Sequence, residues 1–125
     1  MKKTLKALLT AWALFALSSQ ATAASFACGP TSINQIGQRF EGYVNVQTSF
    51  GSFTFCNVSA SFYDVSAETC LGWVAQLLTA RGLGKQVTFH FDNGHTANTS
   101  LAACTASNFA DGYRVPYFIQ VDFTA

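Results

Sequence analysis

The chain has 125 residues, 50% of them hydrophobic and only 10% charged, with a formal net charge of +1. Three of its four lysines are Lys2, Lys3 and Lys6, so beyond residue 23 four basic and six acidic side chains remain and the net charge becomes −2. A mildly acidic segment without a basic cluster argues against nucleic acid and against anionic lipid as partners, because both require several Lys or Arg on one face.

The first 23 residues have the organisation of a secretory signal peptide. The three lysines precede an apolar run over residues 7–17, and Ala21-Thr22-Ala23 is a small-x-small cleavage site. The apolar run is too short for a stable membrane span, and no second run of about 18 apolar residues follows. The sequence therefore predicts an exported single domain over residues 24–125, secreted or periplasmic, without membrane insertion.

Four cysteines follow the predicted cleavage site, namely Cys28, Cys56, Cys70 and Cys104. An even number in an oxidising compartment indicates two disulfides, whereas the absence of any Cys-x-x-Cys pair makes a zinc site the poorer interpretation. Of the three possible connectivities we favour Cys56–Cys70 with Cys28–Cys104, because the short loop can close first and the other bridge then ties down the N-terminal segment. The short loop would contribute about 3 kcal/mol.

The first half of the domain is predicted to contain an irregular arm and a hairpin. Gly29-Pro30 and small polar residues indicate an arm over residues 24–39, pinned by Cys28. Residues 40–47 alternate as a half-buried strand. The inward set is Phe40, Gly42, Val44 and Val46, and the outward set is Glu41, Tyr43, Asn45 and Gln47. A turn over residues 49–52 leads to a second strand over residues 53–60.

One helix is predicted, at about residues 66–81. Its apolar residues have the spacing of a single helix face, with Cys70, Trp73, Val74, Leu77 and Leu78 on that face. Asp64 or Ser66 can cap its N-terminus, and Gly82 with Gly84 can end it.

Strands are predicted again after the helix. Residues 86–92 alternate, and Asn93-Gly94 is a strong hairpin signal with residues 95–101 as the return strand. Residues 115–123 form the last strand, with Val115, Tyr117, Ile119, Val121 and Phe123 facing inward. This order predicts an α+β, mainly β domain, a small OB-like partly open barrel with one helix.

Three segments resemble the B subunits of subtilase-type and pertussis-like bacterial toxins. Residues 83–94 are similar to the helix-strand-turn of that family, Phe53-Thr54-Phe55-Cys56 to its second strand and residues 39–44 to its first strand. The resemblance covers about 50 residues and implies an OB-fold subunit that forms a homo-oligomeric ring of five, binds cell-surface glycans and accompanies a catalytic A-type chain. Two departures are notable, since Glu41 takes the place of a serine that meets sialic acid and the final strand lacks a cysteine.

His90, Asp92 and His95 are candidates for a catalytic or metal role, because the predicted hairpin brings them near one another. A solvated His-Asp pair on a polar strand face is the stronger interpretation. The sequence contains no nucleophile elbow, His-Glu-x-x-His motif or phosphate-binding loop, and its cysteines are expected to be oxidised. We therefore expect no enzyme activity, no cofactor and no metal site. Asp111 and Arg114 are interpreted as a loop ion pair.

The candidate glycan-binding residues are Glu41, Tyr43, His90 and Asp92. An outward-facing tyrosine beside carboxylates and an imidazole can stack on a sugar ring and bond its hydroxyls. Trp73 is interpreted as a core or subunit-interface residue. The sequence thus predicts a non-enzymatic glycan-binding subunit of a homo-oligomer; the alternative is a stand-alone protein-binding domain such as an inhibitor of a cell-wall hydrolase.

Overall fold

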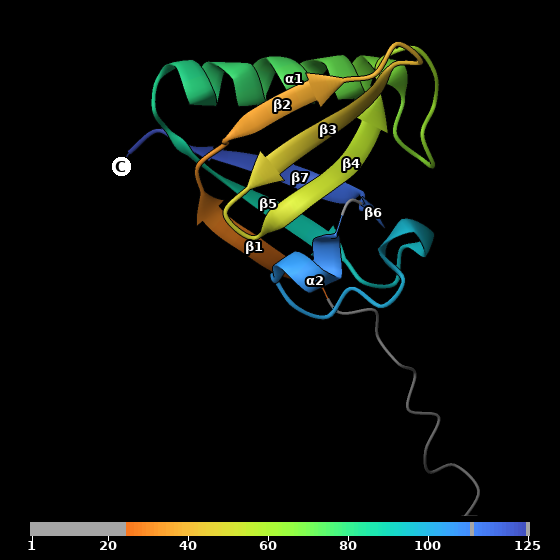
Figure 1. The fold of residues 1–125 in the computed structure, drawn as a ribbon. Helices are drawn as coiled ribbons and strands as arrows, with labels where there is room; N and C mark the ends of the chain where they lie inside the picture. Colours follow the sequence, from red (N-terminus) through yellow and green to blue (C-terminus); the bar gives the residue numbers. More distant parts are fainter. Residues whose placement is uncertain (1–24, 111, 125) are drawn as a thin grey trace, which may run out of the picture.

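The computed structural model describes residues 25–110 and 112–124 (Figure 1). The predicted signal peptide over residues 1–23 lies outside the described residues, and so does Asp111 of the predicted Asp111–Arg114 pair. In the described part, neither helix is both long and apolar enough to cross a membrane.

The domain consists of two β-sheets and one main helix. One sheet is antiparallel in the order β1–β5–β7, formed by Ser25–Thr31, Gln86–Asp92 and Pro116–Asp122. The other has the order β2–β3–β4–β6, formed by Gln35–Gln38, Tyr43–Thr48, Gly51–Asn57 and Gly112–Tyr113, with β6 parallel to β4. The helical elements are α1 (Ala67–Gly82), the 3-10 turn η1 (Thr96–Asn98) and α2 (Ala106–Phe109). The fold is mainly β, and the strand pairings among described residues do not close into a barrel.

Phenylalanine rings fill the space between the two sheets. Phe53 of β4 lies with its ring centroid 5.3 Å from that of Phe89 and 5.7 Å from that of Phe91, both on β5. Phe109 of α2 packs on the same ring at 5.0 Å. These side chains are at most 1% exposed, and edge-on ring contacts of this kind stabilise beyond the area they bury. The alternation predicted for residues 86–92 is confirmed, since Val87, Phe89 and Phe91 are all fully buried.

The predicted helix forms α1 and lies across the ends of the strands in Figure 1, in contact with β4, β5 and β7. Ser66 is the N-cap, because its hydroxyl accepts a hydrogen bond from the Thr69 amide at 3.1 Å. Cys70, Leu77 and Ala80 are fully buried, whereas Leu78 is 52% exposed. The inward prediction for Leu78 was wrong because the buried stripe is narrower than the sequence pattern and includes the small Ala80.

Both disulfides have the favoured connectivity. Cys28 of β1 is bonded to Cys104 in the loop before α2, and Cys56 of β4 is bonded to Cys70 of α1. All four cysteines are therefore oxidised, which indicates folding in an oxidising extracellular or periplasmic environment.

The sequence predicted an irregular N-terminal arm over residues 24–39. This prediction was wrong, because the arm forms the strands β1 and β2. β1 passes so close to β5 that a Cβ atom on Gly29, whose φ is +140°, would lie 2.7 Å from the Val87 carbonyl oxygen. The register shifts between Cys28 and Thr31, so Gly29-Pro30 forms a bulge within the strand. The two turn-forming residues thus interrupt the ladder locally while the strand continues.

Phe40 was predicted to face inward but is 96% exposed. The β2–β3 hairpin turns at this point, since the Gly42 amide donates to the Arg39 carbonyl at 2.9 Å and Gly42 has a φ of +98°. β3 therefore begins only at Tyr43, and the alternation from Val44 onward places Val44 and Val46 in the core as predicted. The hairpin predicted from residues 40–47 and 53–60 is confirmed as the antiparallel pair β3–β4.

The return strand predicted over residues 95–101 does not form. β5 already pairs with β1 on one edge and with β7 on the other, so neither edge is open to a third strand. The chain instead turns at Asn93-Gly94, where the Asp92 side chain accepts from the Gly94 amide at 2.8 Å, and enters η1.

Tyr117 and Phe123 were predicted to face inward and are 56% and 57% exposed. The β5–β7 register shifts, with Phe91 opposite Pro116 but His90 opposite Phe118. Tyr117 occupies the extra position and therefore turns outward, while Phe123 lies beyond the end of β7. Val115 and Ile119 are buried as predicted.

Candidate functional site

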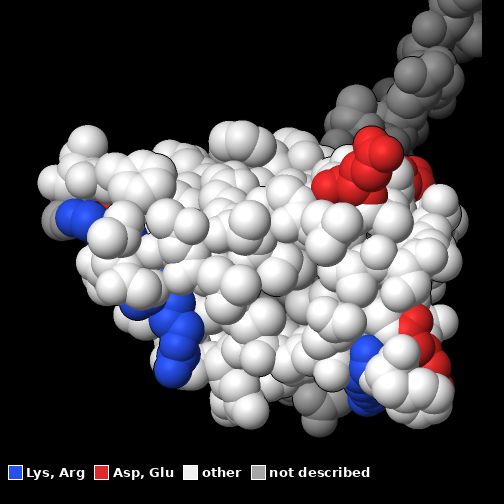
Figure 2. All heavy atoms as spheres, turned by 90° about the horizontal axis from the view of Figure 1, so that it is seen from above, with Lys and Arg blue, Asp and Glu red and all other residues white. Residues whose placement is uncertain are grey.

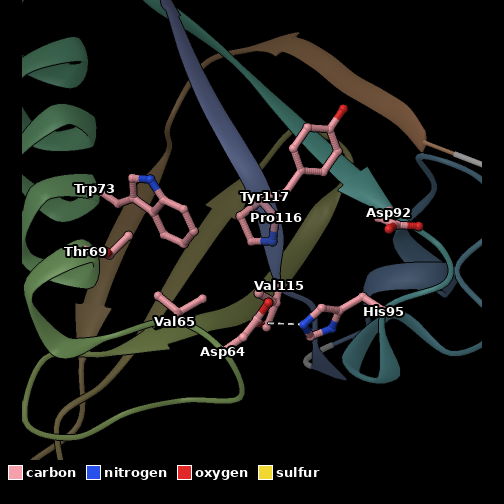
Figure 3. A pocket seen from close by; sticks show the side chains of 9 residues that line it. All are labelled: Asp64, Val65, Thr69, Trp73, Asp92, His95, Val115, Pro116 and Tyr117. Atoms are coloured by element: carbon pink, nitrogen blue, oxygen red, sulfur yellow. Dashed lines mark hydrogen bonds and ion pairs between the residues drawn. The ribbon is translucent and has the colours of Figure 1, made fainter.

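A pocket of about 300 Å³ lies between the start of α1, the end of β5 and the start of β7 (Figure 3). The described residues that line it are Asp64, Val65, Thr69, Trp73, Asp92, His95, Val115, Pro116 and Tyr117. In Figure 3, Trp73 and Asp92 lie on opposite sides of the pocket and the Asp64–His95 pair closes a third side. The pocket thus combines two large aromatic rings, two carboxylates and an imidazole.

Asp64 reaches the pocket from a short loop that precedes α1. The loop closes on itself, since the amides of Phe62 and Val65 each donate to the carbonyl of the other, at 2.9 and 3.0 Å. Tyr63 has a φ of 54° at the tip of this loop, and its ring packs on His95 at a centroid distance of 5.6 Å. This closed turn presents the Asp64 side chain to His95.

Asp64 and His95 form a short polar pair. His95 Nε2 lies 2.6 Å from Asp64 Oδ1, and His95 Nδ1 accepts a hydrogen bond from the Ala97 amide at 3.1 Å. A ring nitrogen that accepts from an amide carries no proton, so this geometry is that of the neutral Nε2–H tautomer, which donates to the carboxylate. The hydrogen bond from His95 lowers the pKa of Asp64 below its usual value of 3.8, so this carboxylate is ionised at neutral and mildly acidic pH.

Asn98 joins the two strand ends that frame the pocket. Its Nδ2 donates to the carbonyls of Asp92 and Val115, both at 2.9 Å, and its Oδ1 accepts from the Val115 amide at 2.9 Å. The residue is 0% exposed. One buried amide therefore holds the end of β5 against the segment that enters β7.

Arg114, between β6 and β7, also ties segments of the chain together through hydrogen bonds to main-chain carbonyls. Its guanidinium donates to the carbonyls of Asn108, Ala97 and Thr99, with the shortest distances 2.8 Å. Burial lowers the pKa of Arg114 from its ordinary value. This cation is thus engaged by carbonyls of η1, of α2 and of Thr99, and it is not a lining residue of the pocket.

The two aromatic walls differ in exposure. Trp73 is half-buried and packs on Phe55 at a centroid distance of 6.3 Å, in agreement with its predicted core role, but it also lines the pocket. Tyr117 is more exposed than buried, and its ring lies 6.1 Å from that of His90. One wall is therefore fixed by the core while the other faces solvent.

The four predicted glycan-binding residues are not gathered in one place. Asp92 lines the pocket, and His90 lies on the outer face of β5, with Nε2 3.1 Å from Gln120 Oε1. Tyr43 packs against Phe62 at 5.8 Å and stacks with Tyr113 at 6.3 Å. Glu41 is exposed in the β2–β3 turn.

Of the described residues that line the pocket, only Asp92 was among the predicted glycan-binding residues; the others are Asp64, Val65, Thr69, Trp73, His95, Val115, Pro116 and Tyr117. The sequence offered Asp64 as a helix cap and His95 as a member of a catalytic or metal group. Among the described residues, no three His, Cys, Asp or Glu side chains are grouped so that they could hold a metal ion. The sequence signal that points to this pocket is the group of polar and turn-forming residues that follows the strand of residues 86–92 and precedes the helix. Loops at strand ends often carry binding residues.

Charged side chains occupy only a few separate spots on the face seen from above in Figure 2, and most of that face is uncharged. No protein-family model, curated protein or solved structure matches this chain. The class defined by the fold and the pocket is therefore a disulfide-linked, two-sheet domain with one main helix and an aromatic, acidic pocket at its strand ends.

Proposed function

We propose that this protein is a secreted, non-enzymatic binding domain that recognises cell-surface glycans, with the pocket between α1, β5 and β7 as the sugar site. The observation that carries the proposal is the combination of Trp73 and Tyr117 with Asp64 and Asp92 around one cavity of about 300 Å³. That volume is at the small end of the range for ligand pockets, which suits a single sugar ring.

The chemistry of the lining supports a sugar ligand. The apolar C–H face of a pyranose packs on an aromatic ring, and Trp73 offers such a ring from a rigid helix. Asp64 and Asp92 can accept hydrogen bonds from sugar hydroxyls. Val65, Val115 and Pro116 add the apolar surface that a pocket of this kind contains.

We expect Trp73→Ala to weaken glycan binding at least tenfold, which corresponds to about 1.4 kcal/mol, because the stacking surface is lost. Binding would be measured on a glycan array and then by titration calorimetry with the best-bound sugar. Thr79→Ala is the control, since Thr79 lies on the same helix, is exposed, does not line the pocket and is not one of the exposed apolar residues.

Trp73 also contacts Phe55, so its variant could be destabilised. Tyr117→Ala removes the exposed ring instead and should weaken binding with little change in thermal stability. Unchanged affinity in both folded variants would place the sugar site elsewhere.

We further propose that the domain is OB-like and assembles into a toxin-B-like homo-oligomeric ring of five that accompanies a catalytic A-type chain. The support is the number of large apolar side chains that are exposed in the single chain, namely Phe40, Tyr63, Leu71, Leu78, Leu83, Tyr113, Tyr117, Phe118 and Phe123. Where such side chains form a contiguous patch, they mark association sites.

The solution mass of the exported protein, measured by light scattering after size exclusion, tests the ring. We expect a mass near that of five protomers. A monomer would contradict the ring, and a monomer without glycan binding would favour the alternative, a stand-alone inhibitor of an enzyme such as a cell-wall hydrolase.

A further inference from the structure

The pocket carries negative charge that no described lining residue neutralises. Asp64 and Asp92 both line it, and none of its described lining residues is Lys or Arg. His95 does not offset the charge, because the Ala97 amide donates to Nδ1 and the ring is then the neutral Nε2–H tautomer. The pocket therefore presents two carboxylates to a ligand.

Two of the chain's arginines are engaged away from the pocket. Arg81 donates through Nη1 to the carbonyls of Ile33 and Asn34, and Arg114 donates to the carbonyls of Asn108, Ala97 and Thr99. Both guanidinium groups hold loops in place. Because no described residue that lines the pocket is Lys or Arg, the ligand is the source of positive charge that these carboxylates can pair with.

A pocket with carboxylates on one side and an indole ring on the other is a suitable environment for an ammonium group. An ammonium is attracted to the face of a Trp ring, and its hydrogen bonds to a carboxylate are about twice as strong as those between neutral groups. An anionic ligand would meet two like charges, which is unfavourable. A neutral sugar would gain the stacking contact and hydroxyl bonds alone.

We infer that the pocket selects an amino sugar whose amine is free and protonated, over neutral sugars and over acidic sugars such as sialic acid. This inference rests on the proposed glycan-binding function and specifies the charge of its ligand. Asp92 and Asp64 bind the ammonium, Trp73 packs on the ring, and both carboxylates also accept hydroxyl hydrogen bonds.

The test compares four monosaccharides on the exported, disulfide-intact protein by titration with NMR detection. The probes are glucosamine, glucose, N-acetylglucosamine and glucuronic acid. We expect glucosamine to bind at least about tenfold more tightly than glucose or N-acetylglucosamine, with glucuronic acid weakest. The preference should shrink as salt is raised, because the charge interaction is screened.

Asp92→Asn keeps an acceptor oxygen for the Gly94 amide and removes one of the two charges, so it should lower glucosamine affinity by a larger factor than glucose affinity and thus shrink the preference. Asp64→Asn is the second variant, with the same expectation. Glu68→Gln is the matched control, because Glu68 lies in the first turn of α1 outside the pocket lining and should leave the preference intact.

The outcomes separate this inference from the function on which it rests. Equal affinity for glucosamine and glucose would overturn the amine preference and leave glycan binding standing. Tetramethylammonium is titrated as a fifth probe, and its binding without binding of any sugar would overturn the glycan function and leave a site for cations alone. Equal losses in Asp92→Asn and Glu68→Gln would overturn the assignment of the charge to the pocket.

Discussion

Replacement of Asn98 with aspartate is expected to lower the free energy of unfolding by about 3–5 kcal/mol, the range measured when a buried charge is left without a partner. The substitution preserves the shape of the side chain. It removes both hydrogen bonds that Nδ2 donates, to the carbonyls of Asp92 and Val115, and places a carboxylate against those two oxygens. Asn98 is 0% exposed, so water cannot compensate. Urea unfolding followed by far-UV circular dichroism measures the loss.

The matched control for Asn98→Asp is Asn34→Asp, at an exposed position where the same change should alter stability by no more than about 0.5 kcal/mol. Folded Asn98→Asp protein, obtained at low temperature, should also bind glycans more weakly, because the ends of β5 and β7 are no longer held together. Equal stability of the two variants would show that the Asn98 bridge contributes nothing to the frame of the pocket.

The secondary structure that was predicted well is the part encoded by local patterns. Residues 86–92 alternate without interruption, and Val87, Phe89 and Phe91 are buried as expected. Ser66 caps a helix with nearly the predicted bounds. The periodicity and the capping residues of these elements lie within a few positions of each other in the sequence. Their formation therefore does not depend on contacts with distant segments.

The errors lie where contacts distant in the sequence decide the outcome. Asn93-Gly94 is a hairpin signal, yet β1 and β7 occupy both edges of β5 and leave no place for a return strand. Gly29-Pro30 suggested an irregular arm, but pairing with β5 absorbs both residues in a bulge. The resemblance to an OB-like barrel stays a prediction, because the described strands form two sheets.

The candidate site was only partly predictable for the same reason. Asp92 was selected for its polar position at the end of a strand, and it lines the pocket. Tyr117 was assigned to the core because a bulge one residue long cannot be read from an alternating pattern. Trp73 was predicted to be a core or subunit-interface residue. Its ring packs on Phe55, as a core residue does, but the residue also lines the pocket.

The disulfide pairing was predicted because four cysteines allow few choices and the short loop is entropically the easiest to close. The two bridges then differ in what they restrain. Cys56–Cys70 joins neighbouring elements over a sequence separation of 14, whereas Cys28–Cys104 spans 76 and links β1 to the loop before α2. The longer bridge therefore connects the first strand of the domain to a segment near its end.

Removal of the longer bridge, by Cys28→Ala with Cys104→Ala, is expected to cost about 4.5 kcal/mol, because a closed loop of this length restricts the unfolded chain strongly. Removal of the shorter bridge, by Cys56→Ala with Cys70→Ala, should cost about 3 kcal/mol on the same grounds. Either loss is a large fraction of the 5–15 kcal/mol that holds a typical domain folded, so the first variant should unfold at much lower urea concentration. The comparison is made by urea unfolding of both double variants beside the oxidised parent. A larger loss for the Cys56–Cys70 variant would contradict the loop-length argument and indicate that the link between β4 and α1 matters through native packing around two fully buried sulfurs.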